Sequence, residues 1–192
     1  MRAEKKYDEQ WELFRAGHAP ALGTIYDQYV LLLYRYGHKL TSDRSVVEDS
    51  IQEVFAELWK RRERISPTTS VKFYLFRALR QKILRELKHH RPTLSLEDVI
   101  HVSHAIDTSL PEKQAQQLRQ ALSHLGPRQK EAIYLKFYNR LSNDEIAAVM
   151  EIDKRTVYNL VSQALGQLKR ELKVAWSALQ LIGWLLLLSQ FI

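Results

Sequence analysis

The chain contains no cysteine, which excludes disulfide bonds, thiolate metal sites and cysteine nucleophiles. Six glycines and five prolines among 192 residues are too few for a turn-rich β fold. The sequence also lacks a glycine-rich phosphate loop and any set of Asp, Glu and His at metal-ligand spacing. We therefore expect no enzymatic activity, no cofactor and no bound metal. The charged N-terminus, residues 1–8, does not resemble a signal peptide, so a cytoplasmic, reducing location is expected.

What the sequence has instead is positive charge and helical periodicity. The formal net charge is +7, which favours a polyanionic partner, although an excess of this size also fits a solvated surface. Apolar residues recur at steps of three and four from about Asp8 to His90 and again from Glu112 to Lys173. The pattern weakens between these segments. We predict an all-α protein with two small helical domains at 7–91 and 112–173, a flexible linker at 92–111 and an apolar C-terminal helix at 174–192.

The second domain carries the most informative pattern, two short helices joined by a tight turn. Ser142 and Glu145 have the spacing of a capping box that starts the first helix. Residues 150–153 form the turn, and Asp153 can cap a second helix with an apolar back and a polar, cationic front. This arrangement is typical of a helix-turn-helix that places side chains in the DNA major groove, although an ordinary helical hairpin has the same periodicity.

The first domain combines a basic and an acidic surface. The helix expected at 71–90 has a stripe containing Tyr74, Arg77, Gln81, Arg85 and Lys88 beside its apolar face. Cations with an interleaved aromatic ring suit single-stranded DNA, whereas cations near a helix C-terminus are also favoured by the helix dipole alone. The preceding helix has a mostly acidic surface at Glu48, Asp49, Gln52, Glu53 and Glu57, which indicates docking on a second protein.

These patterns together resemble a known family. The order Asp49-x-x-Gln52-x-Val54-Phe55-x-x-Leu58-Trp59, a loop and then residues 73–80 is similar to region 2 of bacterial sigma-70-family factors. The run at 125–133 with the helix-turn-helix is similar to region 4. The short length and plain linker point to the extracytoplasmic-function (ECF) group. The resemblance implies a sigma factor that binds RNA polymerase core, recognises the promoter −35 and −10 elements and promotes strand opening.

The resemblance also implies residue roles in the first domain. The helix matching residues 48–59 would bind the β′ clamp helices of polymerase, at positions matched by Asp49, Gln52, Glu53 and Phe55. Phe55 fits a core position as well as a contact. The loop matching Arg64–Ser70 would trap a flipped base of the −10 element, and the basic stripe would hold the non-template strand. The −10 candidates are Arg64, Tyr74, Arg77, Gln81, Arg85 and Lys88.

In the second domain the resemblance implies that the helix after Asp153 binds the −35 element as duplex DNA. The candidate residues are Lys154, Arg155, Thr156, Tyr158, Asn159, Ser162 and Gln163. Asn159 could pair with adenine, Arg155 could reach guanine or a phosphate, and Lys154 suits a phosphate. The helix start at 127–130 would clamp the DNA backbone or face the polymerase β flap, and the sequence leaves both roles open.

Three questions stay open at this level. The apolar segment 174–192 fits burial against the chain or a partner better than membrane association, because its uninterrupted run is too short to span a bilayer. An anti-sigma factor is a further possible partner. The alternatives to a sigma factor are a stand-alone dimeric helix-turn-helix regulator and an enzyme acting on nucleic acid. The acidic helix around Gln52 argues against a simple regulator, which has no use for such a surface.

Overall fold

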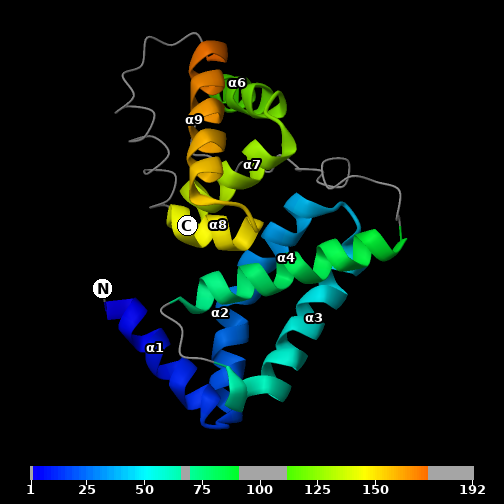
Figure 1. Ribbon diagram of the computed structural model, residues 1–192, viewed down its shortest axis with the longest axis vertical. Coiled ribbons are helices and arrows are strands. Elements are labelled where there is room, and N and C mark those ends of the chain that lie inside the picture. Colours follow the sequence, from blue (N-terminus) through cyan, green and yellow to red (C-terminus); the bar gives the residue numbers. More distant parts are fainter. Residues whose placement is uncertain (1, 66–69, 91–111, 173–192) are drawn as a thin grey trace. The chain divides into compact units, whose positions relative to one another are not determined.

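The computed structural model describes residues 2–65, 70–90 and 112–172, and every regular element within these ranges is a helix (Figure 1). The predicted all-α class is confirmed. Contacts divide the chain into two compact units, residues 1–101 and 102–192. None of the helices in the described ranges has the length and apolar character needed to cross a bilayer. The linker expected at 92–111 and the apolar helix expected at 174–192 lie outside the described residues.

Within the described residues, four α-helices build the first unit. They are α1 (Arg2–Arg15), α2 (Ala19–Leu40), α3 (Arg44–Arg61) and α4 (Val71–His90), with the short 3-10 helix η1 (Arg62–Arg64) after α3. Helix α2 packs against α1, α3 and α4, and α3 also packs against α4. Apolar residues at helical spacing supply this packing, and large side chains such as Trp11, Tyr36, Phe76 and Ile83 are fully buried. The rings of Tyr36 on α2 and Phe76 on α4 stack with centroids 4.8 Å apart.

The buried face of α4 differs slightly from the apolar face that its periodicity predicts. Leu75 is fully buried, whereas Phe73 and Leu87 are only half-buried. The spacing of apolar residues defines a broad stripe, and the neighbouring helices decide which part of that stripe is covered. Helix α3 begins at an N-cap that the sequence analysis did not identify. Asp43 accepts hydrogen bonds from the backbone N–H groups of Ser45 and Val46, at 3.0 and 3.3 Å.

Helix α2 contains one glycine in a crowded position and one in an open position, and the pair provides a matched test of this packing. A Cβ on Gly37 would lie 2.6 Å from a methyl of Val47 on α3 and 3.3 Å from Ile83 on α4. A Cβ on Gly23 would meet nothing within 4 Å. Because alanine favours a helix over glycine by about 1 kcal/mol, we expect Gly23→Ala to raise the unfolding free energy by about that amount. Gly37→Ala should lower it by about 1 kcal/mol, since overpacking beside a stiff valine outweighs the propensity gain.

Urea unfolding followed by hydrogen exchange in peptides from α2, α3 and α4 measures both effects in the full chain. Equal stabilisation by the two substitutions would show that the three helices do not meet as closely as the structure indicates.

The second unit is a smaller helical cluster. It contains α6 (Glu112–Ser123), α7 (Pro127–Ile133), the π-helical turn η2 (Tyr134–Tyr138), α8 (Asn143–Met150) and α9 (Lys154–Glu171). Helix α9 packs against α6, α7 and α8. The α7 start agrees with the sequence, because Pro127 occupies the first turn after the N-cap Gly126. Fully or nearly fully buried residues, including Leu135, Ile146, Val149 and Val157, form the core beneath α9.

Candidate nucleic-acid interface

Helices α8 and α9 form the helix-turn-helix that the sequence predicts. The Ser142 hydroxyl accepts from the backbone N–H of Glu145 at 3.2 Å, and Glu145 Oε2 accepts from the backbone N–H of Ser142 at 2.8 Å. The predicted capping box is therefore confirmed. Helix α8 ends at Glu151, which adopts the left-handed conformation with φ of 55°. The backbone N–H of Ile152 then donates to the carbonyl of Ala147, which closes the turn before α9.

Two of the seven residues expected to meet the −35 element, Lys154 and Thr156, have partners within the protein at the start of α9. Asp153 is the N-cap, as predicted, and accepts from the backbone N–H of Thr156 at 2.8 Å and from its hydroxyl at 2.5 Å. The hydrogen bonds from Thr156, chiefly from its hydroxyl, lower the pKa of Asp153. Lys154 forms an ion pair with Asp144 on α8 at 2.9 Å. Thr156 thus helps to cap α9 and Lys154 links α9 to α8, roles that the sequence alone does not indicate.

The other five candidates share one exposed face of α9. These residues are Arg155, Tyr158, Asn159, Ser162 and Gln163. Tyr158 is 65% exposed, and none of the five side chains has a hydrogen bond or ion pair within the part of the chain that the structure describes. The opposite face, which includes Val157, Val161 and Ala164, is buried. Helix packing therefore fixes the orientation of α9 while leaving a row of polar groups available to an external partner.

Three candidates for the −10 element come together in the first unit. Tyr74, Gln81 and Arg85 on α4 line a cavity of about 150 Å³ beside α3. Residues of both helices complete its lining, namely Val54, Glu57, Leu58, Arg61, Ala78 and Lys82. Three cations and one carboxylate make the cavity net positive. The remaining −10 candidates, Arg64, Arg77 and Lys88, are exposed but do not line it.

The ring of Tyr74 packs against another ring of the protein, whereas a ring that stacks on an unpaired base would need an open face. Its ring centroid lies 5.6 Å from that of the fully buried Trp11 on α1, at an interplanar angle of 58°. Burial raises the pKa of Tyr74, and the nearby Arg61 only partly opposes this shift. The hydroxyl therefore stays protonated at neutral pH and can donate a hydrogen bond in the cavity. The sequence gives no signal for this contact, because periodicity does not link residues on different helices.

The residues expected to dock on polymerase separate into exposed and buried groups. Asp49, Gln52 and Glu53 lie on the exposed side of α3, and Glu53 forms an ion pair with Lys82 on α4. Phe55 is only 6% exposed and packs edge-on against Tyr26 of α2, with ring centroids 4.9 Å apart. Its position favours the core role among the two that the sequence allows.

Models of known protein families match both units of the chain. The model described as "Sigma-70 region 2" matches residues 25–93, and the model described as "Sigma-70, region 4" matches residues 115–168. The first match contains α3 and α4, and the second contains the helix-turn-helix. The chain belongs to the sigma-70 family and, within it, to the extracytoplasmic-function group. It is accordingly a sigma factor, which binds RNA polymerase and recognises promoters.

Relatives of known function agree with this assignment. The ECF RNA polymerase sigma factor SigL of Mycobacterium tuberculosis is 26% identical over 172 residues, which cover 82% of this chain and 92% of SigL. The ECF RNA polymerase sigma factor BldN of Streptomyces coelicolor is 28% identical over 169 residues, which cover 83% of this chain and 63% of BldN.

Two solved structures share the fold. CnrH, solved in complex with the cytosolic domain of CnrY, aligns with a TM-score of 0.60 and 19% identity, and the alignment covers 88% of this chain and 98% of CnrH. RpoE of Bartonella quintana, solved with the anti-sigma factor NepR, aligns with a TM-score of 0.55 and 23% identity, covering 80% of this chain and 99% of RpoE.

Proposed function

We propose that the two units of this sigma factor divide promoter recognition through the surfaces described above. The exposed face of α9 reads the −35 element in the major groove, with Arg155 and Asn159 as the base-reading residues. The cavity between α3 and α4 engages the opened −10 region. The acidic, outward side of α3 docks on the polymerase core. The observation that carries the proposal is the set of exposed polar side chains on α9 that have no partner among the described residues and are held in place by a buried opposite face.

The −10 assignment is supported by the charge of the cavity and by the hydrogen-bonding groups that line it. Arg61, Lys82 and Arg85 can track phosphates, while Gln81 and the protonated hydroxyl of Tyr74 present hydrogen-bonding groups to an unpaired base. Because the Tyr74 ring packs on Trp11, we assign Tyr74 to hydrogen bonding with a base and not to stacking on one. Arg77 and Lys88 lie on the exposed side of α4 and are assigned to backbone phosphates.

Docking on polymerase is assigned to α3 because its exposed side is acidic. Glu48, Asp49 and Glu53 lie around Gln52. Glu48 pairs with Arg44 and Glu53 with Lys82, whereas Asp49 has no partner within the described residues, and its carboxylate repels DNA and suits a cationic protein partner. Gln52 does not line the cavity assigned to the −10 region. It therefore reports on the docking face alone.

We expect Gln52→Arg to weaken binding to polymerase core about tenfold or more, because it introduces bulk and a like charge where a cationic partner contacts α3. Fluorescence anisotropy of the labelled full chain titrated with core enzyme measures the affinity. Gln120→Arg, on the exposed side of α6, is the matched control and should bind core normally. If Gln52→Arg bound core as tightly as the control, the docking face would lie elsewhere.

We also propose that an anti-sigma factor regulates this chain. The two fold neighbours were each solved with a partner, the cytosolic domain of CnrY for CnrH and the anti-sigma factor NepR for RpoE. An exposed acidic face on α3 and an exposed polar face on α9 offer surfaces that such a partner would need to cover to keep the chain from polymerase and DNA.

A further inference from the structure

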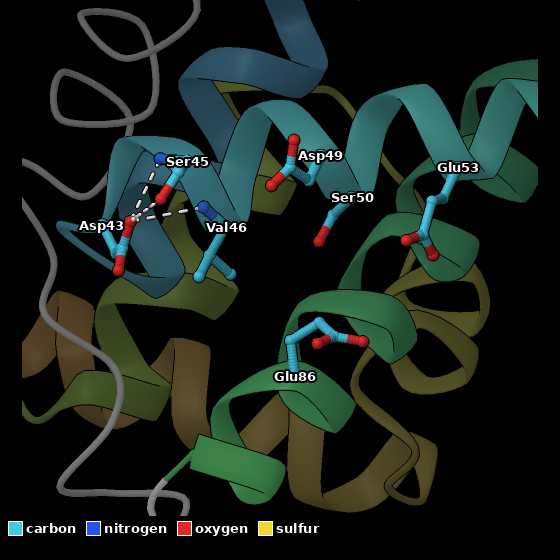
Figure 2. Close-up of a pocket in the computed structure, with 7 residues that line it drawn as sticks. All are labelled: Asp43, Ser45, Val46, Asp49, Ser50, Glu53 and Glu86. Atoms are coloured by element: carbon cyan, nitrogen blue, oxygen red, sulfur yellow. Dashed lines mark hydrogen bonds between the residues drawn. The ribbon is translucent and has the colours of Figure 1, made fainter.

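A second cavity in the first unit lies between the N-terminal half of α3 and the C-terminal half of α4, and its volume is about 350 Å³ (Figure 2). Its lining consists of Asp43, Ser45, Val46, Asp49, Ser50, Glu53 and Glu86. Four of these seven residues are acidic, and no cationic side chain lines the cavity. None of the sigma-family roles described above accounts for the cavity as a whole, because it joins two residues of the docking surface, Asp49 and Glu53, to residues outside that surface.

The hydroxyl of Ser50 is the feature that turns this acidic cluster into a site. Ser50 is only 1% exposed, and its Oγ has no hydrogen-bond partner among the residues that the structure describes. Figure 2 shows the hydroxyl directed from α3 into the space above Glu86. A serine within a helix commonly bonds the carbonyl one turn back, and Ser50 does not. A buried hydroxyl without a partner is unfavourable, so a group that enters the cavity and bonds it gains affinity.

The four carboxylates around Ser50 differ in whether another group of the protein already pairs with them. Glu53 is paired with Lys82, and Asp43 holds the N-cap of α3. Asp49 and Glu86 have neither a hydrogen bond nor an ion pair within the described ranges. Two uncompensated carboxylates on different helices therefore flank an unsatisfied hydroxyl. The lining offers oxygen acceptors from both α3 and α4, which suits a cationic group with several donors.

The hydrogen-bonding groups of the lining indicate which kind of cation would bind in the cavity. Within the residues that the structure describes, no three His, Asp or Glu side chains are placed so that they could hold one metal ion together, and the four carboxylates of this lining are no exception, so a divalent cation is a poor fit. An ammonium is a compact point charge, whereas a guanidinium offers five N–H donors in a fixed planar fork. That fork has enough donors for Glu86, the Ser50 hydroxyl and Asp49 at the edge of the cavity. We propose that the cavity receives an arginine side chain of the polymerase core subunit on which α3 docks.

The inference rests on the proposed docking of α3, and the cavity extends that surface directly. Asp49 and Glu53 belong both to the exposed side of α3 and to the cavity lining. A partner that covers α3 therefore also covers the mouth of the cavity. The arginine fixes the register of the docking, because a bidentate pair is more directional than contact between two charged surfaces.

Ser50→Ala separates a binding role from a structural one. Removing an unsatisfied buried hydroxyl, with alanine as the better helix former, should leave the unfolding free energy of the full chain unchanged or higher. Binding to polymerase core, measured by anisotropy, should nevertheless weaken about threefold to tenfold. A variant that is as stable as the parent chain and binds core with full affinity would overturn the role of Ser50.

Charge removal tests the carboxylates with a matched control. Glu86→Gln should weaken core binding about tenfold, whereas Glu9→Gln, which removes an exposed carboxylate of α1, should not. Gln52→Arg in the same series distinguishes the two proposals. Loss of binding in Gln52→Arg with full binding in Glu86→Gln would overturn the arginine site and keep the docking face. Full binding in both variants would overturn both.

A direct probe identifies the ligand class without polymerase. N-acetyl-arginine methylamide titrated into the isotope-labelled full chain should shift the backbone amide signals of Asp49, Ser50 and Glu86. N-acetyl-lysine methylamide at the same concentration should shift them several-fold less, because it lacks the planar fork. Equal shifts with both probes, or shifts that persist in Glu86→Gln, would show general attraction of cations and overturn the proposal.

Discussion

Replacing Arg155 and Asn159 together with alanine is expected to abolish measurable recognition of the −35 element by the full chain or the holoenzyme. Each residue is exposed on α9 and, within the described residues, each side chain lacks a partner that would have to be released first. A lost bidentate base contact costs about 1–3 kcal/mol, so each single substitution should weaken binding roughly tenfold to a hundredfold. The residues lie one turn apart on the same face, and the double variant should combine both losses.

The measurement uses promoter fragments selected with reconstituted holoenzyme, followed by binding of duplexes with one base changed at a time. Asn159→Ala should bind all bases equally at one position and leave the other preferences intact. Lys169→Ala, in the exposed last turn of α9, is the contrasting variant. It should weaken all duplexes uniformly and reduce the slope of log affinity against log salt by about 0.9. Uniform weakening by Asn159→Ala as well would show that α9 contacts only the DNA backbone.

Local signals in the sequence predicted the helix-turn-helix well, because capping is a short-range interaction. Ser142 with Glu145 and Asp153 with Thr156 are each three residues apart in the sequence, and these pairs define the starts of α8 and α9. The same interactions explain what the sequence could not show. Thr156 is a good candidate for DNA contact by position alone, yet its hydroxyl is bonded to Asp153 in the folded chain.

Contacts between distant segments were beyond sequence reasoning for a physical reason. Helical periodicity specifies which face of a helix is apolar but not which residue on another helix it meets. The ring contact of Tyr74 with Trp11 and the ion pair of Glu53 with Lys82 each depend on how two helices pack. The same holds for the Ser50 cavity, because Glu86 is far along the chain and reaches the site only through the pairing of α3 with α4.

The second large effect is expected on the opened −10 region. Replacing Arg77 and Arg85 together with alanine should weaken binding of holoenzyme to a single-stranded −10 oligonucleotide about tenfold or more. Both guanidinium groups are exposed on α4, and Arg85 also lines the positive cavity beside α3. Because each cation that meets a single-strand phosphate contributes about 0.7 to the salt slope, the double variant should lower that slope by about 1.4. Binding of the −35 duplex should not change.

Tyr74→Phe completes this test because it keeps the ring packed on Trp11 and removes only the hydroxyl. If the hydroxyl donates to a base, Tyr74→Phe should weaken oligonucleotide binding about threefold to tenfold without altering the salt slope or the stability of the unit. Tyr74→Ala would also remove the packing and is therefore less informative. An unchanged salt slope in the double arginine variant would rule out phosphate contact by this face of α4, and an unaffected Tyr74→Phe variant would assign Tyr74 to packing alone. The two readouts are independent, since one reports charge and the other a neutral hydrogen bond.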